Sequence, residues 1–357
     1  MARGVTLSVV DQSPVRAGGT AAEALQETVA LAQRAEALGY RRYWVAEHHN
    51  SGTFAGTAPE ILAGQIAART TTIRVGSAGV MLTHYAALKV AEQFCILASF
   101  YPGRIDLGIG RAPGSDQRTA AALVDPKPMA DVRHFPQQVL DLLAFLHDKV
   151  PDEHRFAGIR AQPGPPLAAA PEVWLLGSSD YSAQLAAALG LPFAFADFFG
   201  YASDQGPDVA QLYRQQFKPS EYLKEPKLNV TLQVLCADTD ERARFIGSSK
   251  RLQVAQSRTG HRRQPLRPPE EAYQVFSNPE AASLIASVTG HIIEGGPETV
   301  RREILDAGER YGTMDIGLAT TPYFFEDRVR SYELIADVFG SYGTIAIDWA
   351  HPGHTES

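Results

Sequence analysis

The sequence predicts an α/β fold, a (β/α)8 TIM barrel with an insertion between its seventh and eighth strands. Short apolar runs alternate with helical patterns almost from the first residue, and eight such strand–helix units follow one another. All of these runs are short and apolar, which is typical of parallel strands covered by helices. A length of 357 residues suits one barrel with insertions, although it would also accommodate two domains. Because no internal repeat or interdomain linker is visible, we expect one domain over residues 1–357.

The first four units occupy the N-terminal third of the chain. Thr20 and Glu23 have the spacing of a capping box at the start of the first helix, and Gly39 suits the position just after its end. Pro59 is expected to open the second helix. Strands are expected at residues 5–10, 41–46, 73–80 and 104–110, and helices at about 20–38, 59–69 and 89–100.

The fourth strand carries the most informative pattern. Ile105, Leu107 and Ile109 share one face, which we expect to pack against helices. On the opposite face, the two residues nearest the carboxyl end of the strand are glycines, Gly108 and Gly110. Because glycine has no side chain, a bulky ligand can approach the backbone there.

The second half of the chain continues the alternation after a polar connection that reaches residue 129, in which no helix is expected before about Asp131. Residues 151–171 contain five prolines and are expected to form an excursion with a short strand near Arg155. Strands are expected at 173–176, 193–196, 228–236 and 314–319, and helices at 132–147, 182–189, 209–217, from 241 onward, 299–307 and 329–339.

The alternation breaks between residues 248 and 287. Residues 256–271 contain a basic run at 258–267 together with prolines and a glycine. This composition disfavours a packed helix or strand. Such a charge run is most often a solvated surface. The alternative is a lid, and we describe 248–287 as a lid-like insertion that is expected to be mobile without ligand and to cover the barrel mouth when cofactor or substrate binds.

Composition and charge exclude several classes of partner. The formal net charge of −7 argues against nucleic acid or an anionic membrane surface, both of which need a basic surface. Cys95 and Cys236 are the two cysteines, so we expect no disulfide framework and a cytoplasmic location. No signal peptide and no apolar run of membrane-spanning length are visible, so no membrane association is expected.

Polar or glycine-containing segments follow four of the expected strands. In barrels of this type, ligands bind at the carboxyl ends of the strands. The convergence of four such segments favours a binding site over four unrelated loops. The segments are Glu47-His48-His49-Asn50, Ser77-Ala78-Gly79, Gly110-Arg111 and Gly177-Ser178-Ser179-Asp180.

His48 is the candidate catalytic residue. Adjacent strand residues point to opposite faces, so His48 shares a face with Trp44 and Ala46, whereas His49 points away. If that face lines the barrel interior, His48 reaches the ligand. A buried histidine held by hydrogen bonds is the alternative interpretation. We expect no metal, because no second histidine or carboxylate lies at a ligand spacing such as His-x-x-x-His.

Arg111 and the Gly177-Ser178-Ser179 segment suit an anion. The segment offers backbone N–H groups and hydroxyls at the start of a helix, and Arg111 follows the neighbouring strand, so both could hold one phosphate. The alternatives are an ordinary surface arginine and a simple N-cap. A dinucleotide fingerprint is disfavoured because Pro113 stands where its last glycine would be.

Together these segments resemble the luciferase-like monooxygenases, flavin-dependent (β/α)8 barrels related to the α subunit of bacterial luciferase. The likeness covers roughly residues 5–200 and returns at 296–300 and 330–334. The motifs that carry it are Glu47-His48-His49, Val75-Gly76-Ser77-Ala78-Gly79-Val80-Met81-Leu82, Ala91-Glu92-Gln93 and Pro102-Gly103-Arg104-Ile105-Asp106-Leu107-Gly108-Ile109-Gly110-Arg111.

The resemblance implies roles for the site residues. His48 would lie beside the flavin and act in catalysis, while Arg111 and the turn with Ser178 and Ser179 would hold the flavin phosphate. Ala78-Gly79 matches the position at which the family tends to have a cis peptide under the flavin ring. Luciferase has a cysteine where this chain has Gly110, so flavin reactivity need not be tuned in the same way.

The resemblance further implies reduced FMN (FMNH2) as cofactor and O2 as co-substrate, with oxygenation of a small organic substrate through a C4a-peroxyflavin. A separate NAD(P)H:flavin reductase would supply the reduced flavin, and we expect a homodimer. The loop at residues 82–87 departs from relatives, so an aldehyde substrate and light emission are not carried over. The alternatives are an F420-dependent hydride-transfer oxidoreductase and a non-catalytic flavin-binding partner subunit.

Overall fold

Eight parallel strands close into a barrel in this computed structural model, which describes residues 4–126, 131–164, 170–200, 204–260 and 264–340. The sheet closes because the sixth strand pairs with the seventh, and the last strand pairs with both the first and the seventh. The barrel strands are β1 (Thr6–Asp11), β2 (Arg42–Val45), β3 (Arg74–Met81), β4 (Ile105–Gly110), β5 (Glu172–Gly177), β6 (Phe193–Ala196), β7 (Leu228–Cys236) and β9 (Asp315–Ala319), and the short additional strand β8 (Ile293–Gly295) pairs with the end of β7. The prediction of a (β/α)8 barrel is confirmed.

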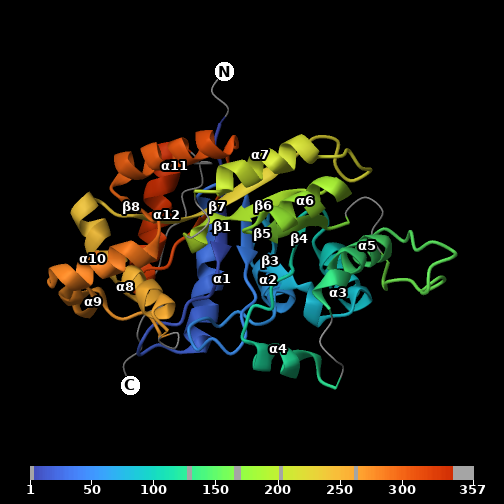
Figure 1. Ribbon diagram of the computed structural model, residues 1–357, viewed down its shortest axis with the longest axis horizontal. Helices are drawn as coiled ribbons and strands as arrows, with labels where there is room; N and C mark the ends of the chain where they lie inside the picture. Colours follow the sequence, from blue (N-terminus) through green and yellow to red (C-terminus); the bar gives the residue numbers. More distant parts are fainter. Residues whose placement is uncertain (1–3, 127–130, 165–169, 201–203, 261–263, 341–357) are drawn as a thin grey trace.

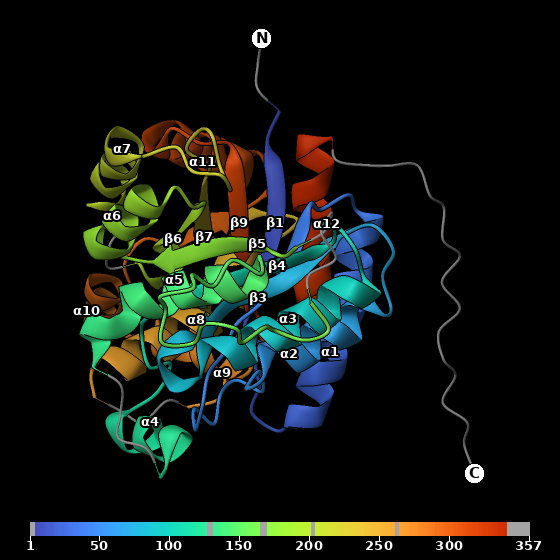
Figure 2. The ribbon, with the colours of Figure 1, turned by 90° about the vertical axis from the view of Figure 1, so that its right-hand side faces the viewer.

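Helices surround the strands, and α1, α2 and α3 lie side by side along one flank (Figure 2). The capping box at the start of α1 is present, since Thr20 Oγ1 accepts from the Glu23 N–H at 3.1 Å and the Glu23 carboxylate accepts from the Thr20 N–H at 2.7 Å. The described α-helices are α1 (Ala21–Ala37), α2 (Pro59–Ala67), α3 (Ala87–Phe100), α4 (Gln117–Val124), α5 (Phe135–Leu146), α6 (Asp180–Leu189), α7 (Gly206–Gln216), α8 (Asp240–Arg258), α9 (Pro269–Val275), α10 (Pro279–Thr289), α11 (Pro297–Tyr311) and α12 (Phe325–Phe339).

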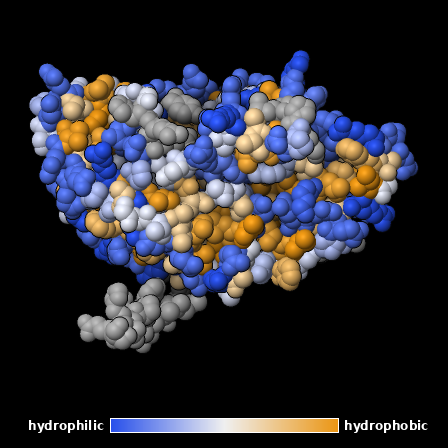
Figure 3. All heavy atoms as spheres, turned by 90° about the horizontal axis from the view of Figure 1, so that it is seen from below, coloured by the Kyte–Doolittle hydropathy of each residue, from blue (hydrophilic) through white to orange (hydrophobic). Residues whose placement is uncertain are grey.

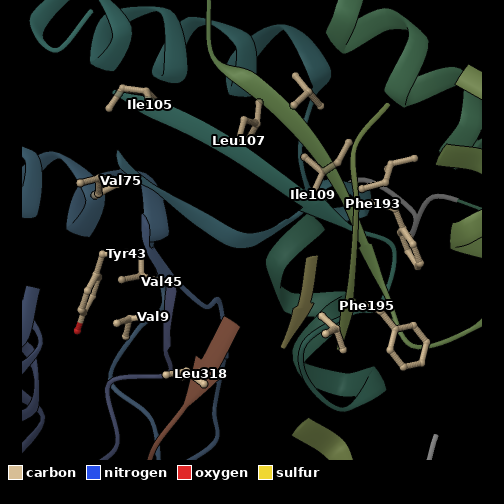
Figure 4. Packing of buried hydrophobic residues seen from close by; sticks show 14 of the residues in the cluster. Val9, Tyr43, Val45, Val75, Ile105, Leu107, Ile109, Phe193, Phe195 and Leu318 are labelled. Carbon is tan, nitrogen blue, oxygen red and sulfur yellow. The ribbon is translucent and has the colours of Figure 1, made fainter. Parts of the chain in front are cut away.

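The main core lies between the barrel and its helices. Alternate residues of each strand point outward into this layer, as predicted for Ile105, Leu107 and Ile109 of β4. Val9 and Tyr43 from the neighbouring strands belong to the same buried cluster (Figure 4). The opposite set of strand residues therefore faces the barrel interior, and this alternation decides which side chains can reach a ligand there.

Two tryptophans and a charged network fill the amino-terminal part of the barrel interior. The rings of Trp44 and Trp174 meet edge to face with centroids 5.1 Å apart, and the Arg42 guanidinium lies over both. Trp44 Nε1 donates to Asp106 at 2.8 Å, and Arg42 pairs with Asp315 at 2.9 Å. Because these groups close the amino-terminal end, the interior is left open at the carboxyl ends of the strands.

The insertion between β7 and β9 contains three helices, of which the sequence analysis expected only the first, and the stretch between Arg258 and Pro269 lies outside them. Helix α8 continues to Arg258, and α9 and α10 pack against it around Leu252, Ala255, Ala272 and Ile285. These three helices form a group of their own at one side of the barrel (Figure 1). Residues 261–263 of the basic run lie outside the described part of the chain. Movement of the group as a lid stays a prediction.

Three shorter elements also differ from expectation. Helix α4 lies in the connection in which no helix was expected, and Asp116 caps it by accepting from the Thr119 N–H at 2.9 Å. Strand β8 has only three residues and pairs with the end of β7, so its pattern is too short to be seen in the sequence. The strand expected near Arg155 is wrong, because the backbone there forms turns. Within the described residues, no helix has the length and apolar character needed to cross a bilayer.

Candidate active site

A cavity of ≈ 440 Å³ opens where the strands end. β1 enters the barrel from the top of Figure 1, so this mouth faces downward, toward α4. Figure 3 views the molecule from that side, and hydrophobic side chains gather across the middle of this face. All eight residues that the sequence predicted for the site line this one cavity, namely His48, Ala78, Gly79, Gly110, Arg111, Gly177, Ser178 and Ser179.

His48 follows the end of β2 and faces the interior, on the same side as Trp44 and Ala46, as the alternation predicted. Its backbone N–H donates to the Gly56 carbonyl at 2.9 Å, and its ring lies 4.8 Å from the ring of Phe54. The carboxamide nitrogen of Gln12 lies 3.2 Å from His48 Nε2. This contact orients the imidazole ring of His48 in the cavity. Gln12 directly follows β1 and was not among the predicted site residues.

Glu47 organises the rim of the cavity beside His48. Its buried carboxylate accepts from the Met81 N–H at 2.9 Å and from the Tyr85 hydroxyl at 2.7 Å, and it pairs with His49 Nε2 at 2.7 Å. Burial and the adjacent Glu47 charge raise the pKa of Tyr85 above its ordinary value, so the hydroxyl stays a donor. His49 therefore helps to hold the Glu47 carboxylate, which in turn connects the segment after β2 to the end of β3. The two histidines therefore differ in role, because His49 pairs with Glu47 whereas His48 lines the cavity.

The floor of the cavity is flat and apolar. The Ala78–Gly79 peptide is cis, as the sequence resemblance implied. A Cβ atom at Gly79 would lie 2.4 Å from Leu176 Cδ1, and one at Gly108 would lie 3.0 Å from the same atom. Leu176 itself lines the cavity, so the protein uses the space that these glycines leave to bring an apolar side chain beneath the site. Ala78, Gly79 and Leu176 together suit the face of a flat ring.

One side of the cavity is suited to an anion. The Arg111 guanidinium stacks on the Tyr181 ring at 4.0 Å, and within the described ranges no carboxylate forms an ion pair with it. Ser179 is the N-cap residue of α6 and its side chain does not cap the helix, while the Tyr181 N–H in the first turn donates to the Asp180 carboxylate at 2.8 Å. Since β4 and β5 are neighbours, the cation and the helix start converge.

These features fit a ligand that carries a phosphate group and a flat ring, such as a flavin. A planar guanidinium held on an aromatic ring matches the oxygens of a phosphate, and the apolar floor matches the isoalloxazine ring. Across the part of the chain that the structure describes, no cluster of three or more His, Cys, Asp or Glu side chains is placed to hold a metal ion.

The chain matches the family model described as luciferase-like monooxygenase over residues 5–314. It is 44% identical to the uncharacterized protein YwcH of Bacillus subtilis over 336 residues, which cover 94% of this chain and 99% of YwcH. It is 38% identical to the N-acetyl-S-alkylcysteine monooxygenase of Bacillus subtilis over 339 residues, 93% of this chain and 98% of that protein.

Solved structures share the fold. Apo-MsnO8 superimposes with a TM-score of 0.86 at 36% identity, covering 94% of this chain and 98% of that one. An FMN complex of the oxygenating constituent of 3,6-diketocamphane monooxygenase reaches a TM-score of 0.68 at 17% identity and covers 94% and 97%. An F420-dependent secondary alcohol dehydrogenase reaches 0.64 at 13% identity and covers 96% and 100%. These last two are similar in fold alone.

Proposed function

Since the chain belongs to the luciferase-like monooxygenase family and is an oxidoreductase, we propose that it uses reduced FMN and O2 to oxygenate a small organic substrate at the barrel mouth. The observation that carries this proposal is the single cavity in which Arg111, the start of α6, an apolar floor and His48 converge. The F420-dependent alternative is supported by fold similarity at 13–14% identity, whereas the monooxygenase relative is 38% identical over nearly its whole length.

Each part of the cavity has a role in this proposal. Arg111 and the N–H groups at the start of α6, with the Ser178 and Ser179 hydroxyls, bind the phosphate. Ala78–Gly79 supports the ring. The bound reduced flavin supplies two electrons, so that one oxygen atom of O2 enters the substrate and the other leaves as water. His48 holds or moves a proton at a ring nitrogen, and Gln12 orients the ring through its contact with Nε2.

The test is a pair of anaerobic titrations of the protein, one with reduced FMN and one with reduced F420. We expect saturable binding of reduced FMN and much weaker binding of reduced F420. Preferential binding of F420 would instead favour hydride transfer, and binding of neither would reject a flavin site. We also propose a separate NAD(P)H:flavin reductase and a homodimer. A reductase requirement predicts that the protein alone does not oxidise NADH or NADPH in the presence of FMN.

Removing the Arg111 guanidinium should weaken reduced-FMN binding by about 1.5–3 kcal/mol, because a hydrogen bond to a charged phosphate is lost. Arg111→Lys should recover only part of this affinity, since lysine lacks the planar fork. Arg118→Ala is the matched control, because Arg118 is an exposed arginine on α4 that does not line the cavity. Equal affinities of wild type and Arg111→Ala in the titration would mean that the phosphate binds elsewhere.

A further inference from the structure

A second, smaller cavity of ≈ 180 Å³ adjoins the first at His48. His48, Phe198 and Phe199 line both cavities, so they form the boundary between them. Phe198 and Phe199 belong to the short 3-10 helix η3 (Asp197–Phe199) after β6, and their ring centroids lie 4.4 Å apart. A ligand in the smaller cavity therefore lies next to the cofactor cavity and against the candidate catalytic side chain.

Three residues that line the smaller cavity are polar, uncharged and buried. They are Gln12, Thr53 and Gln233, which come from the segment after β1, the loop after β2 and strand β7. Only 5%, 2% and 6% of their surfaces are exposed. Burying a polar group is costly unless the group is hydrogen-bonded, so the partners of these side chains decide what the cavity can bind.

Gln233 presents an unused acceptor to the smaller cavity. Its carboxamide nitrogen donates to the Ala319 carbonyl at 2.8 Å, and because a carbonyl only accepts, this bond fixes which end of the carboxamide is the nitrogen. The carboxamide oxygen forms no hydrogen bond with any residue that the structure describes, and it is not sealed within the protein. A ligand that satisfies Gln233 must therefore offer a hydrogen-bond donor.

The Thr53 hydroxyl is held in position without being used by the fold. The Thr53 N–H donates to Ser51 Oγ at 3.2 Å, and the Thr53 carbonyl accepts from the Val15 N–H at 2.8 Å. The hydroxyl itself forms no hydrogen bond within the described ranges, although the residue is almost fully buried. Because a hydroxyl both donates and accepts, it complements Gln233, which offers only an acceptor.

The remaining lining is partly apolar. Phe54 stacks on the His48 imidazole with ring centroids 4.8 Å apart, and Val254 and the two phenylalanines of η3 add further apolar surface. Since Phe198 and Phe199 also line the cofactor cavity, this apolar surface reaches the boundary at which oxygenation would occur. The smaller cavity thus combines an uncharged polar part with an apolar part.

Two cationic residues of α8, Lys250 and Arg258, also line the smaller cavity. Lys250 Nζ lies 3.4 Å from Gln253 Oε1, and the Arg258 guanidinium donates to the Phe199 carbonyl at 2.5 Å. Their charges favour anions in general. A carboxylate has no hydrogen to donate, however, so it would leave the Gln233 acceptor unsatisfied and place negative charge against it.

We propose that the smaller cavity binds the substrate and that the substrate is a small secondary amide. The amide N–H donates to Gln233 Oε1, and the amide carbonyl accepts from the Thr53 hydroxyl. The apolar part of the substrate lies against Phe198 and Phe199, at the boundary with the cofactor cavity. This assignment rests on the proposed function, because it takes the larger cavity to be the flavin site.

The test is an anaerobic binding titration followed by ligand-detected NMR, with and without reduced FMN. The probes are N-butylacetamide, butyl acetate and hexanoate, which have the same number of non-hydrogen atoms. We expect wild type to bind the amide roughly tenfold to a hundredfold more tightly than the ester, because the ester leaves the Gln233 acceptor without a donor. Hexanoate should also bind more weakly than the amide. Equal binding of amide and ester, tighter binding of hexanoate, or no binding of the amide would overturn the assignment.

Thr53→Val separates a role in binding from a role in folding. It should weaken amide binding by about threefold to tenfold and leave the free energy of unfolding unchanged or higher, because the lost hydroxyl bonds no described residue. Thr70→Val is the matched control, since the buried Thr70 hydroxyl donates to the Ile66 carbonyl at 2.8 Å and accepts from Arg104 at 2.7 Å. It should lose stability and bind the amide as wild type does. Unchanged amide binding in Thr53→Val, or a loss of stability as large as in Thr70→Val, would contradict the proposal.

The binding of reduced FMN distinguishes this assignment from the proposed function. Reduced FMN should bind wild type and Thr53→Val equally, since Thr53 lines the smaller cavity and not the larger one. Failure of wild type to bind reduced FMN would contradict the proposed function. Normal FMN binding without a preference for the amide would contradict only the substrate assignment.

Discussion

Replacing His48 by alanine is expected to lower turnover by roughly 10²–10⁴-fold, the range found when a positioned proton donor or acceptor is lost. Reduced-FMN affinity should stay nearly unchanged, because the phosphate is anchored at Arg111 and the start of α6, on other strands. His48 lines the large cavity and also a smaller one of ≈ 180 Å³ that adjoins it.

His49→Ala is the matched control for this prediction. The imidazole of His49 pairs with Glu47 at 2.7 Å rather than lining the cavity, so its loss should reduce stability more than turnover. Turnover is measured as oxygenated product per enzyme with a flavin reductase supplying reduced FMN, and affinity by anaerobic titration. A larger loss of turnover in His49→Ala than in His48→Ala would contradict the assignment of His48.

Replacing Arg328 by methionine is expected to lower the free energy of unfolding by about 3–5 kcal/mol, because it leaves a buried carboxylate without its counter-charge. Arg328 on α12 pairs with Asp11 at the end of β1 at 2.6 Å, and both side chains are almost fully buried. Its Nε also donates to the Thr320 carbonyl at 2.8 Å. The Tyr43 hydroxyl donates to the other Asp11 oxygen at 2.5 Å. The pair therefore ties the last helix to the first strand of the barrel.

Arg330→Met is the matched control, because Arg330 lies two residues away but pairs with Asp238 at the surface. Loss of this exposed pair should cost at most about 1 kcal/mol. Chemical unfolding followed by circular dichroism measures both variants. Similar losses of stability in the two variants would mean that the buried pair contributes no more than a surface one.

The same pair makes a prediction about pH. Burial by itself would raise the pKa of Asp11, but the Arg328 charge and the hydrogen bonds from Arg328, Tyr43 and Ser13 outweigh burial and lower it. In wild type this stabilisation is present above the unfolded-state pKa and is lost as the pH falls toward the lower folded-state value. Without Arg328, burial is expected to raise the pKa of Asp11. Protonation then removes the cost of keeping a charged carboxylate buried without a counter-charge. The stability deficit of Arg328→Met should therefore shrink between about pH 7 and about pH 5; a constant deficit would contradict this.

Much of the barrel could be predicted from the sequence because its signals are local. Each strand of the barrel is an apolar run bounded by turns, and the alternation along β4 correctly separated the outward Ile105, Leu107 and Ile109 from the inward glycines. The packing of α9 and α10 could not be seen, because their few apolar residues are buried only against α8. Strand β8 could not be predicted either, because it is only three residues long and is defined by its pairing with β7 rather than by a sequence pattern.

The cofactor side of the site was predictable because strand ends in a barrel converge by geometry. The contribution of α8 was not. Lys250 and Arg258 lie on a polar helix whose sequence is typical of solvated surface, and only the course of the insertion brings them into a cavity of ≈ 180 Å³ that His48 also lines. Gln12 follows β1 without a motif that distinguishes it, and its role depends on contact with a ring 36 positions away. Leu176 occupies the space above Gly108 that the sequence suggested was open to ligand.

The central claim, oxygenation supported by reduced FMN, is tested most directly by tracing the oxygen atom. Wild-type protein is incubated under ¹⁸O2 with a flavin reductase, NADH, FMN and N-acetyl-S-methylcysteine, and the product mass is determined. This probe belongs to the compound class named in a 38% identical relative, the N-acetyl-S-alkylcysteine monooxygenase. We predict a product that carries one atom of ¹⁸O, formed only when FMN and the reductase are both present. A product labelled from water, or one that has lost hydrogen without gaining oxygen, would contradict the account.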